Sequence, residues 1–472
     1  MEYLLQKDYN ININNKLFLW FFLFKKNLLN PSNSNRFVKI LLSLFQQTGG
    51  VKMKVTVIDS IMGSGKTTSL INMMNENTEE KFIYITPYRD EIDRVIANCP
   101  NRYFETPKNF DKINLKTCTK YEDLIKIIEQ DINVVSTHAL FQTFDENIIK
   151  VLKEHKYTLV LDEVAQVVEE INISSDDIRM LINDGVIAVN ENKRIIWLND
   201  DYDGEFIKYK ESFKNGEVYL YGGSVIIWCF PCEIFDCFDK VIISTYLFKG
   251  QLQCYYFQVN NIEFEYKSAV KSINNKGEYE FNIVDYTEEY DYKSLSGLIN
   301  IYEGKLNSIG EDKDGRKKPL SSTWYKEATG EKLKLVQNNT YNYFRHVCDK
   351  KSNEVLWTVF KFRAETPETK KNRMTKIKPN GYNKSFETCN CRATNKYRER
   401  DTVAYLINRY NSPAIINFFK DRGAEVDEDA FALSELLQFI WRSCIRDGKP
   451  INVYIPSKRM RNLLKAWLNG GK

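Results

Sequence analysis

Apolar and polar positions along the chain predict strands and helices in turn from residue 53 onward. Short, mostly apolar runs, typical of buried parallel strands, are separated by stretches with a helical period. The segments in which this pattern predicts a strand are Lys54–Ile58, Lys81–Arg89, Asn133–Phe141, Tyr157–Leu161, Val241–Tyr246, Val355–Phe360 and Ile451–Ile455. Strands separated by helices favour a parallel α/β sheet, which binds ligands at the carboxyl ends of its strands.

The length and composition predict a folded protein of more than one domain. The chain has 472 residues, about three times the ~150 residues of a typical domain. With 43% hydrophobic and 28% charged residues, it differs from disordered, collagen-like and disulfide-scaffold proteins. The formal net charge of +4 is too small to indicate a nucleic-acid partner by itself. We expect one domain over residues 53–270 and a second over residues 271–472.

The first 52 residues differ from the rest. The apolar run Leu17–Phe24 is flanked by lysines and is shorter than the ~20 residues that span a bilayer. It also lacks the cleavage site of a signal peptide. The codons of Gly49 and Gly50 can contain a purine-rich ribosome-binding sequence just ahead of Met53. We therefore interpret Met53 as the natural start and residues 1–52 as translated leader, the alternative being a genuine, poorly ordered extension.

A glycine-rich loop follows the first predicted strand. From Asp59 to Thr68 the sequence reads DSIMGSGKTT, and a helical stretch follows. This strand–loop–helix order is the setting of a phosphate-binding loop, or P-loop, although Ser60 stands where the first glycine is usual. In such a loop the lysine reaches the β- and γ-phosphates, and the next hydroxyl is a ligand of Mg²⁺. The nucleotide-binding candidates are Gly63, Ser64, Gly65, Lys66, Thr67 and Thr68, with Thr67 also a metal candidate.

A second strand ends in two adjacent acids. Tyr157–Leu161 is mostly apolar and leads into Asp162 and Glu163, about a hundred residues after the P-loop. This is the pattern of a Walker B element, in which the first acid holds Mg²⁺ and the second activates the attacking water. We therefore predict Asp162 as a metal ligand and Glu163 as the general base.

The order of five short motifs resembles that of superfamily 2 helicases. GSGKT, TPYR, STHAL, LDEV and ISTY are similar to motifs I, Ia, Ib, II and III, with the phage-encoded, origin-binding replication helicases the nearest in kind. Tyr246 stands where that family has a small residue, and LDEV differs from the common DEAD and DEAH spellings.

The resemblance also implies roles for the residues in these motifs. It implies that motif III couples hydrolysis to strand movement and that the turns of motifs Ia and Ib contact the DNA backbone. The coupling candidates are Ser244 and Thr245, and the DNA-binding candidates of the two turns are Thr86, Pro87, Thr137 and His138. An equally weighted alternative for His138 is a hydrogen-bonded histidine at a strand end.

The second half carries two further resemblances. Phe386–Asn395 is similar to the motif V region and contains Arg392, a further DNA-binding candidate. Ala432–Arg446 is predicted as an amphipathic helix with Arg442 and Arg446 on one face, since they are four residues apart. They resemble the motif VI arginines that reach the γ-phosphate, although Trp441 and the spacing of four depart from the family pattern. Either arginine is therefore a candidate for the catalytic role, and a surface pair is the alternative.

The resemblance implies an α/β P-loop NTPase fold of two RecA-like domains with a nucleotide cleft between them. It also implies an ATP-dependent DNA helicase or translocase of phage replication, with ATP and Mg²⁺ as cofactors. The expected partners are single-stranded or forked DNA and other replication proteins, but no membrane, and the expected location is the cytoplasm of a bacterial host. Two alternatives remain: a phage terminase-type packaging ATPase, and an ATP-gated origin DNA-binding protein that does not unwind.

Overall fold

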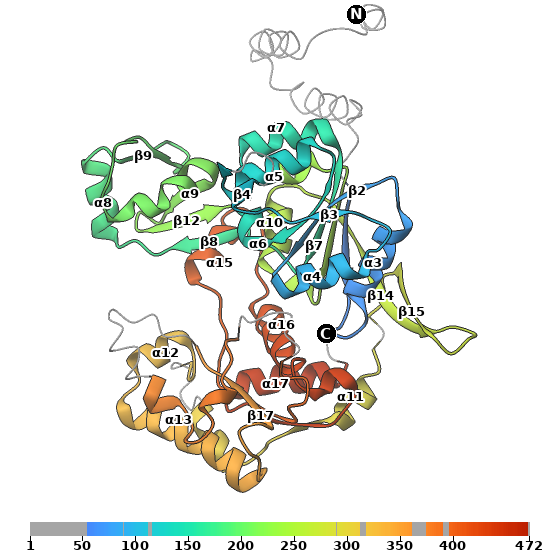
Figure 1. The fold of residues 1–472 in the computed structure, drawn as a ribbon. Coiled ribbons are helices and arrows are strands. Elements are labelled where there is room, and N and C mark those ends of the chain that lie inside the picture. Colours follow the sequence, from blue (N-terminus) through green and yellow to red (C-terminus); the bar gives the residue numbers. More distant parts are fainter. Residues whose placement is uncertain are drawn as a thin grey trace, which may run out of the picture. The chain divides into compact units, whose positions relative to one another are not determined.

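The computed structural model describes residues 54–470 except 88, 112–115, 289, 312–317, 361–373 and 390–395. The expected leader or extension, residues 1–52, and the DNA-binding candidate Arg392 lie outside the described residues. The described part is a mixed α/β structure built on a large, mostly parallel sheet and a smaller parallel sheet (Figure 1).

The first sheet has eight strands. In spatial order the strands are β15 (Tyr279–Asp285), β14 (Phe264–Ile273), β1 (Lys54–Asp59), β13 (Lys240–Thr245), β7 (Tyr157–Asp162), β2 (Lys81–Thr86), β6 (Asn133–Thr137) and β3 (Phe104–Glu105). Every neighbouring pair is parallel except the edge pair β14 and β15, which is antiparallel. Asp59 lies beside Thr245, and Ser244 lies beside Asp162. The predicted motifs I, II and III therefore end at one edge of the sheet.

Helices cover both faces of the central strands, which is why β2, β7 and β13 are mostly apolar and buried. Phe82 and Tyr84 of β2 pack with α3 and α4, whereas Ile83 and Ile85 pack on the other face with α5 and α7. The helices of this part are α3 (Lys66–Glu76), α4 (Arg89–Asn98), α5 (Lys120–Glu129), α6 (His138–Phe141), α7 (Glu146–His155) and α10 (Leu252–Val259). A two-stranded hairpin, β4 (Phe110–Asp111) with β5 (Lys116–Thr117), precedes α5.

A segment that the motif pattern does not predict is inserted between β7 and β13. It holds a three-stranded antiparallel sheet, β11–β12–β8, and a two-stranded one, β10–β9. Its elements are β8 (Val168–Ile171), α8 (Ser175–Asn183), β9 (Ile187–Val189), β10 (Ile195–Trp197), η2 (Glu205–Tyr209), α9 (Lys210–Asn215), β11 (Glu217–Tyr221), β12 (Val225–Cys229) and η3 (Cys232–Cys237). Its apolar side chains are continuous with the core of the first sheet.

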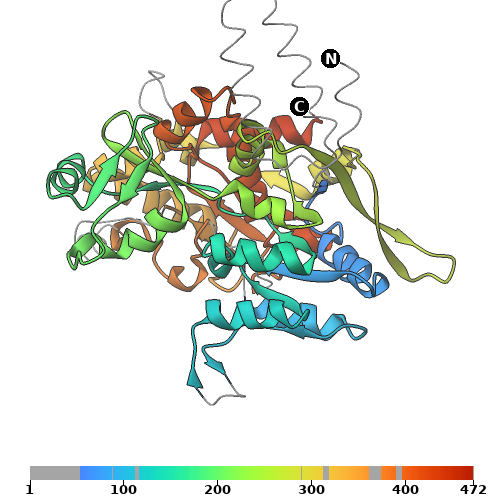
Figure 2. The ribbon, with the colours of Figure 1, turned by 90° about the horizontal axis from the view of Figure 1, so that it is seen from above.

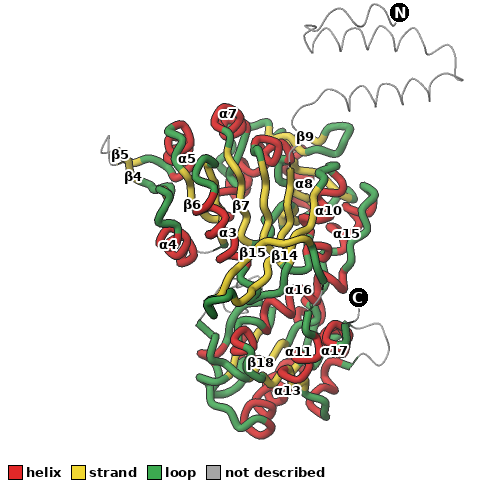
Figure 3. Tube along the Cα trace, turned by 90° about the vertical axis from the view of Figure 1, so that its right-hand side faces the viewer, coloured by secondary structure: helices red, strands yellow, loops and turns green. Residues whose placement is uncertain are grey.

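The second sheet has four parallel strands, in the order β16 (Ile299–Ile301), β19 (Ile451–Tyr454), β18 (Thr402–Tyr405) and β17 (Val355–Thr358). Figure 3 shows helices on both of its sides. One face packs with α11 (Tyr292–Leu298), α16 (Glu428–Ile440) and α17 (Lys458–Leu468). The other packs with α12 (Ser322–Glu327), α13 (Gly330–Asn342) and η6 (Tyr343–Val347). Helix α17 has a serine cap: the Ser457 hydroxyl accepts from the Met460 amide.

The first sheet continues beyond the expected domain boundary. Residues 270 and 271 both lie inside β14, which pairs in parallel with β1 and turns into β15. In Figures 1 and 2 this hairpin, olive, reaches beyond the other strands of the sheet. The passage to the second sheet therefore comes after Asp285 and before Ile299.

Helix α15 (Pro413–Lys420) belongs to the second half in sequence but packs in the core of the first. Phe418 and Phe419 are 2% and 0% exposed there. The hydroxyl of Tyr221 donates to Asp421 over 2.6 Å, and Tyr255 accepts the Asp427 amide over 2.8 Å. The first core is thus completed by residues far away in sequence.

We expect Phe419→Ala to lower the free energy of unfolding by about 3–5 kcal/mol, because it opens a cavity in this core. The matched control is Lys420→Ala on the same helix, whose side chain is exposed and whose replacement should change stability by less than about 0.5 kcal/mol. Chemical denaturation measures both. A loss below about 1 kcal/mol for Phe419→Ala would contradict the placement of α15 in the first core.

Candidate active site

Two glycines shape the loop between β1 and α3. Gly63 and Gly65 have φ angles of 87° and 90°, a region that other residues rarely adopt. A Cβ atom on Gly65 would also lie 2.0 Å from the ring of Phe281 in β15. The loop presents the N-terminus of α3, where unpaired backbone N–H groups favour an anion. The Ser64 hydroxyl is buried there without a hydrogen-bond partner among the described residues.

The Lys66 ammonium is held by the loop that precedes it. It donates to the carbonyl oxygens of Ser60 at 2.5 Å and Ile61 at 3.2 Å. Loss of hydration lowers the pKa of Lys66, and the charges of Glu163, Asp59 and Asp162 oppose that shift. Lys66 is therefore a poorly hydrated cation beside carboxylates, and its place in the first turn of α3 is that of a phosphate-binding lysine.

Thr67 and Asp162 lie side by side. The Thr67 hydroxyl donates to Asp162 Oδ2 over 3.4 Å. Burial raises the pKa of Asp162 to about 7, and the nearby charges of Glu163 and Glu91 act in the same direction. Burial and the charge of Asp162 likewise raise the pKa of Tyr84, on β2, well above its ordinary value. A hydroxyl and a carboxylate in this arrangement are the oxygen donors that Mg²⁺ prefers.

Glu163 is fixed by motif III. Its φ angle of 74° is unusual for a residue other than glycine. Its amide donates to the Ser244 carbonyl over 2.8 Å, and its Oε2 accepts from the Thr245 hydroxyl over 3.2 Å. Ser244 and Thr245 are themselves fully buried. The structure thus brings the two predicted coupling residues onto the predicted general base.

Asp59 and Ser60 have positions that the motif analysis did not identify. Asp59 accepts the amides of Leu247 and Phe248 at 2.8 and 2.9 Å, and burial raises its pKa. The Ser60 hydroxyl accepts the Ala269 amide at 2.7 Å and so joins the P-loop to β14. The sequence does show an acid at the end of the P-loop strand, and this feature could have identified Asp59.

The DNA-binding candidates of the first half lie at the ends of β2 and β6, where Thr86 and Thr137 are neighbours. The Thr86 side chain is fully buried and offers no surface to a ligand in this structure. Pro87 and Thr137 are partly exposed. His138 Nε2 lies 3.1 Å from the Asp162 carbonyl, which only accepts, so Nε2 carries the proton. This is the contact expected of a strand-end histidine, and it places His138 against the Walker B turn.

The two candidate arginines do not share a helical face, which corrects the sequence interpretation. Helix α16 ends at Ile440. Ser443 has an extended backbone, and its hydroxyl donates to the Ile440 carbonyl over 2.6 Å. Arg442 is 5% exposed and donates to the carbonyls of Thr388 at 3.4 Å and Cys389 at 3.1 Å. Its guanidinium is therefore directed into the second half.

Arg446 lies in η8 (Cys444–Asp447), against the P-loop. A Cβ atom on Gly63 would be 3.7 Å from the Arg446 carbonyl oxygen and 3.9 Å from its Cγ. The positive charge of Arg446 contributes to the lowered pKa of Lys66. Its own pKa is lowered by loss of hydration and then by the charge of Arg398. The structure thus brings Arg446, but not Arg442, to the predicted nucleotide site.

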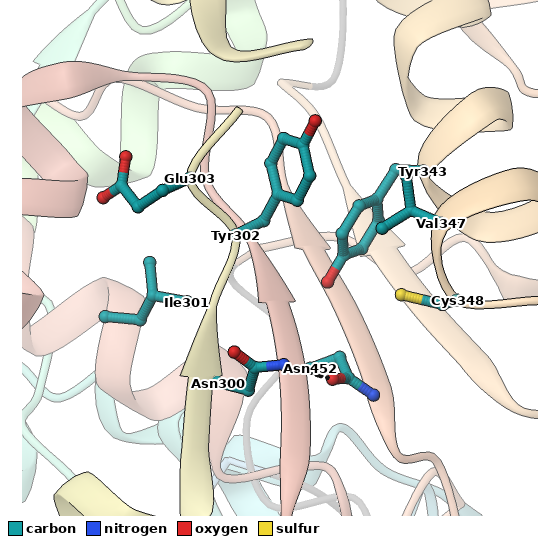
Figure 4. Close-up of a pocket in the computed structure, with 8 residues that line it drawn as sticks. All are labelled: Asn300, Ile301, Tyr302, Glu303, Tyr343, Val347, Cys348 and Asn452. Atoms are coloured by element: carbon teal, nitrogen blue, oxygen red, sulfur yellow. Dashed lines mark hydrogen bonds between the residues drawn. The ribbon is translucent and has the colours of Figure 1, made fainter. Parts of the chain in front are cut away.

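A separate cavity of about 350 Å³ lies on the second sheet (Figure 4). It is polar and aromatic, and none of the described residues that line it has a cationic side chain. Its lining residues are Asn300, Ile301, Tyr302, Glu303, Tyr343, Val347, Cys348 and Asn452. Without a cation it does not suit a triphosphate, so the P-loop edge is the better candidate for a nucleotide site.

Comparison with known proteins identifies the family. The chain is 41% identical over 426 residues to the SPbeta prophage-derived uncharacterized protein YonV of Bacillus subtilis (strain 168). The match covers 88% of this chain and 98% of that protein. The chain belongs to the YonV family. Two models of this family match, the YonV middle domain over residues 168–228 and the YonV C-terminal Rossmann-like domain over residues 293–468.

These matches follow the architecture. The YonV middle domain spans β8 to β12, which is most of the segment inserted between β7 and β13. The YonV C-terminal domain begins in α11, ahead of the second sheet, and ends with α17. The P-loop, Asp162 and Glu163 precede both matched segments, whereas Arg446 lies within the C-terminal one.

Two solved structures are also similar to the chain. Xpd4 of S. tokodaii matches with a TM-score of 0.44 and 13% identity, over 89% of this chain and 94% of that one. The DUF1998 helicase MrfA, bound to DNA and AMPPNP, matches with a TM-score of 0.30 and 12% identity, over 91% of this chain and 50% of that one. Among the helices that the structure describes, none has the length and apolar character needed to cross a membrane.

We expect Arg442→Ala to lower the free energy of unfolding by about 2–3 kcal/mol, because two carbonyl groups lose a charged donor. Arg446→Ala should cost less than about 1 kcal/mol, since this side chain is more exposed. Urea denaturation of the two variants measures the difference. Equal losses would contradict the separate roles that the geometry gives these arginines.

Proposed function

We propose that the protein is an ATP-dependent DNA helicase or translocase of phage replication, acting in the cytoplasm of a bacterial host. The observation that carries the proposal is the position of Arg446. A cation from the second sheet's domain lies against the P-loop, on which Lys66, Thr67, Asp162 and Glu163 converge. A P-loop flanked by a cation from another domain is the arrangement of a nucleotide hydrolase whose domains move against each other.

The residues present fit ATP and Mg²⁺. Gly63–Thr68 and the N-terminus of α3 suit the phosphates, and the orphan hydroxyl of Ser64 lies in the same loop. Thr67 and Asp162 supply a hydroxyl and a carboxylate for the cation. Held by these two residues, Mg²⁺ would supply positive charge that offsets the charge of the phosphates.

The chain's own residues account for hydrolysis. Glu163 accepts a proton from the water that attacks the γ-phosphorus, and the bond to the ADP oxygen breaks. The Thr245 hydroxyl, bonded to Oε2, fixes the direction of that carboxylate. Lys66 and Arg446 neutralise the charge of the phosphate oxygens in the transition state. Arg442 instead donates to the carbonyls of Thr388 and Cys389, which lie within the motif V region.

DNA is proposed as the partner on the order of the motifs and on the edge at which they end. Pro87 and Thr137 are partly exposed at adjacent strand ends, and His138 contacts the Walker B turn. A strand bound there would be next to Glu163 and motif III. This adjacency supports coupling between hydrolysis and movement along one strand.

The first functional prediction separates ATP binding from hydrolysis. Lys66→Ala should abolish turnover, because the phosphates lose their charge partner. Glu163→Gln should retain ATP binding and lose hydrolysis, because the amide cannot accept the proton. Steady-state ATPase assays with and without single-stranded DNA, together with equilibrium nucleotide binding, measure these effects. Wild-type turnover by Glu163→Gln would refute the assignment of the base.

A strand-displacement assay on forked DNA then distinguishes the kinds of motor. A helicase unwinds with ATP and stops unwinding with Glu163→Gln. ATP-dependent DNA binding without displacement, by the wild-type protein, would favour an ATP-gated origin-binding protein. If the protein neither binds DNA nor hydrolyses ATP faster in its presence, the proposal is refuted.

The second functional prediction concerns Arg446. If it stabilises the transition state, Arg446→Ala should cut kcat by roughly 10³–10⁵, the range measured for such arginines, and leave ATP affinity nearly unchanged. If Arg446 contacts DNA instead, the loss should fall on DNA binding. For single-strand binding, the slope of log K against log salt concentration would then fall in magnitude by about 0.7 per lost contact. Normal DNA-stimulated hydrolysis would remove Arg446 from the mechanism.

A further inference from the structure

We infer that Tyr246 is a positioning residue that links the base Glu163 to Arg446 through a hydrogen bond to Trp467, an inference that rests on the proposed ATP hydrolysis. Tyr246 directly follows motif III, at the position where the resembled family has a small residue. None of the sequence matches gives it a role. Its side chain crosses from the first half of the molecule into the core of the second.

The backbone around Tyr246 is bonded to the nucleotide site on both sides. The preceding residue, Thr245, donates to Glu163 through its hydroxyl and accepts the Ser60 amide, at 3.1 Å, through its carbonyl. The following residue, Leu247, has a φ angle of 53° and donates its amide to Asp59. Displacement of the P-loop or of Glu163 therefore displaces Tyr246.

The side chain of Tyr246 is bound at its far end. It is 2% exposed, and its hydroxyl accepts from Trp467 Nε1 of α17 over 2.8 Å. Its ring meets that of Tyr290 edge to face, with centroids 6.0 Å apart. A buried tyrosine with both ring and hydroxyl engaged has a defined position, so motion of its backbone is passed on to α17.

Trp467 in turn contacts the element that leads to Arg446. Its ring lies edge to face against that of Trp441, with centroids 5.7 Å apart. Trp441 directly follows the last residue of α16, and Arg446 follows five residues later against Gly63. Contacts thus connect Glu163 through Thr245, Tyr246 and Trp467 to Trp441. The chain from Trp441 to Arg446 then completes the path back to the P-loop.

The P-loop also touches this core directly. Ile61 and Met62 pack against the same cluster of apolar residues as Tyr246. Direct packing resists separation of the two halves but has no preferred direction. The Tyr246–Trp467 hydrogen bond does have one, because a bond of this kind weakens steeply when donor and acceptor are misaligned. We therefore assign the placement of Arg446 to this bond.

The test is Tyr246→Phe, which keeps the ring and removes only the hydroxyl. In the full chain, kcat for ATP hydrolysis should fall roughly tenfold, a modest part of what an arginine of this kind contributes, while KM for ATP stays within about twofold. Trp467→Phe removes the donor from the other side and should give the same pattern. The double variant should be no slower than the slower single one, because both changes break one interaction.

The decisive test introduces Tyr246→Phe into the Arg446→Ala variant. If Tyr246 acts by placing Arg446, then Tyr246→Phe should not lower kcat further once Arg446 is alanine. An equal factor in both backgrounds would show that Tyr246 acts independently of Arg446 and would overturn the inference. A merely structural role would lower thermal stability without producing this dependence.

Tyr405→Phe is the matched control. Tyr405 is fully buried in the same core, and its hydroxyl has no hydrogen-bond partner among the described residues. Its replacement should leave kcat and KM unchanged. If the wild-type protein hydrolyses ATP and Tyr246→Phe does so equally well, the inference fails while the proposed function stands. A wild-type protein that hydrolyses no ATP removes both.

Discussion

Lys66 places a positive charge where hydration is poor, and the strands around it supply the negative charge that keeps it there. Two carbonyls of the P-loop accept from its ammonium, and Asp59, Asp162 and Glu163 surround it electrostatically. These carboxylates come from β1 and from the end of β7, with β13 between them. Parallel pairing in this register is what brings them to one point, because the carboxyl ends of parallel strands meet at one edge of the sheet.

The same edge connects the two halves of the molecule. The turn after β13 is bonded to Asp59 and to Glu163, and its next side chain, Tyr246, is buried in the second core. The P-loop residues Ile61 and Met62 pack there as well. The Lys66 ammonium and a surface that holds the second half therefore occupy one small region.

Much of this region is readable from the sequence because buried parallel strands leave a strong local signal. The apolar runs before Gly63, Asp162 and Ser244 predict strands, and the structure has β1, β7 and β13 there. The polar residues that end each run were therefore placed at the correct edge. Tyr84 escaped notice because its importance comes from Asp162 on a neighbouring strand, which a local pattern does not reveal.

The long-range features were not predictable in this way. An apolar pattern shows that Phe418 and Phe419 are buried but not in which core, and the structure places them in the first. The insertion between β7 and β13 gave no motif, and the boundary near residue 270 cut a strand that pairs with β1. In each case pairing or packing between distant segments decided the outcome, and a single sequence records only which residues are apolar.

The two arginines show how one hydroxyl changes a functional interpretation. A spacing of four places both on one face only while the helix continues. The Ser443 hydroxyl donates to the Ile440 carbonyl in place of a helical amide, as serine does at helix ends. Helix α16 therefore ends before both Arg442 and Arg446. Arg442 then points inward to two carbonyls, and the chain turns through η8 to bring Arg446 to Gly63. The place where the helix ends therefore decides that Arg446, and not Arg442, lies against the P-loop.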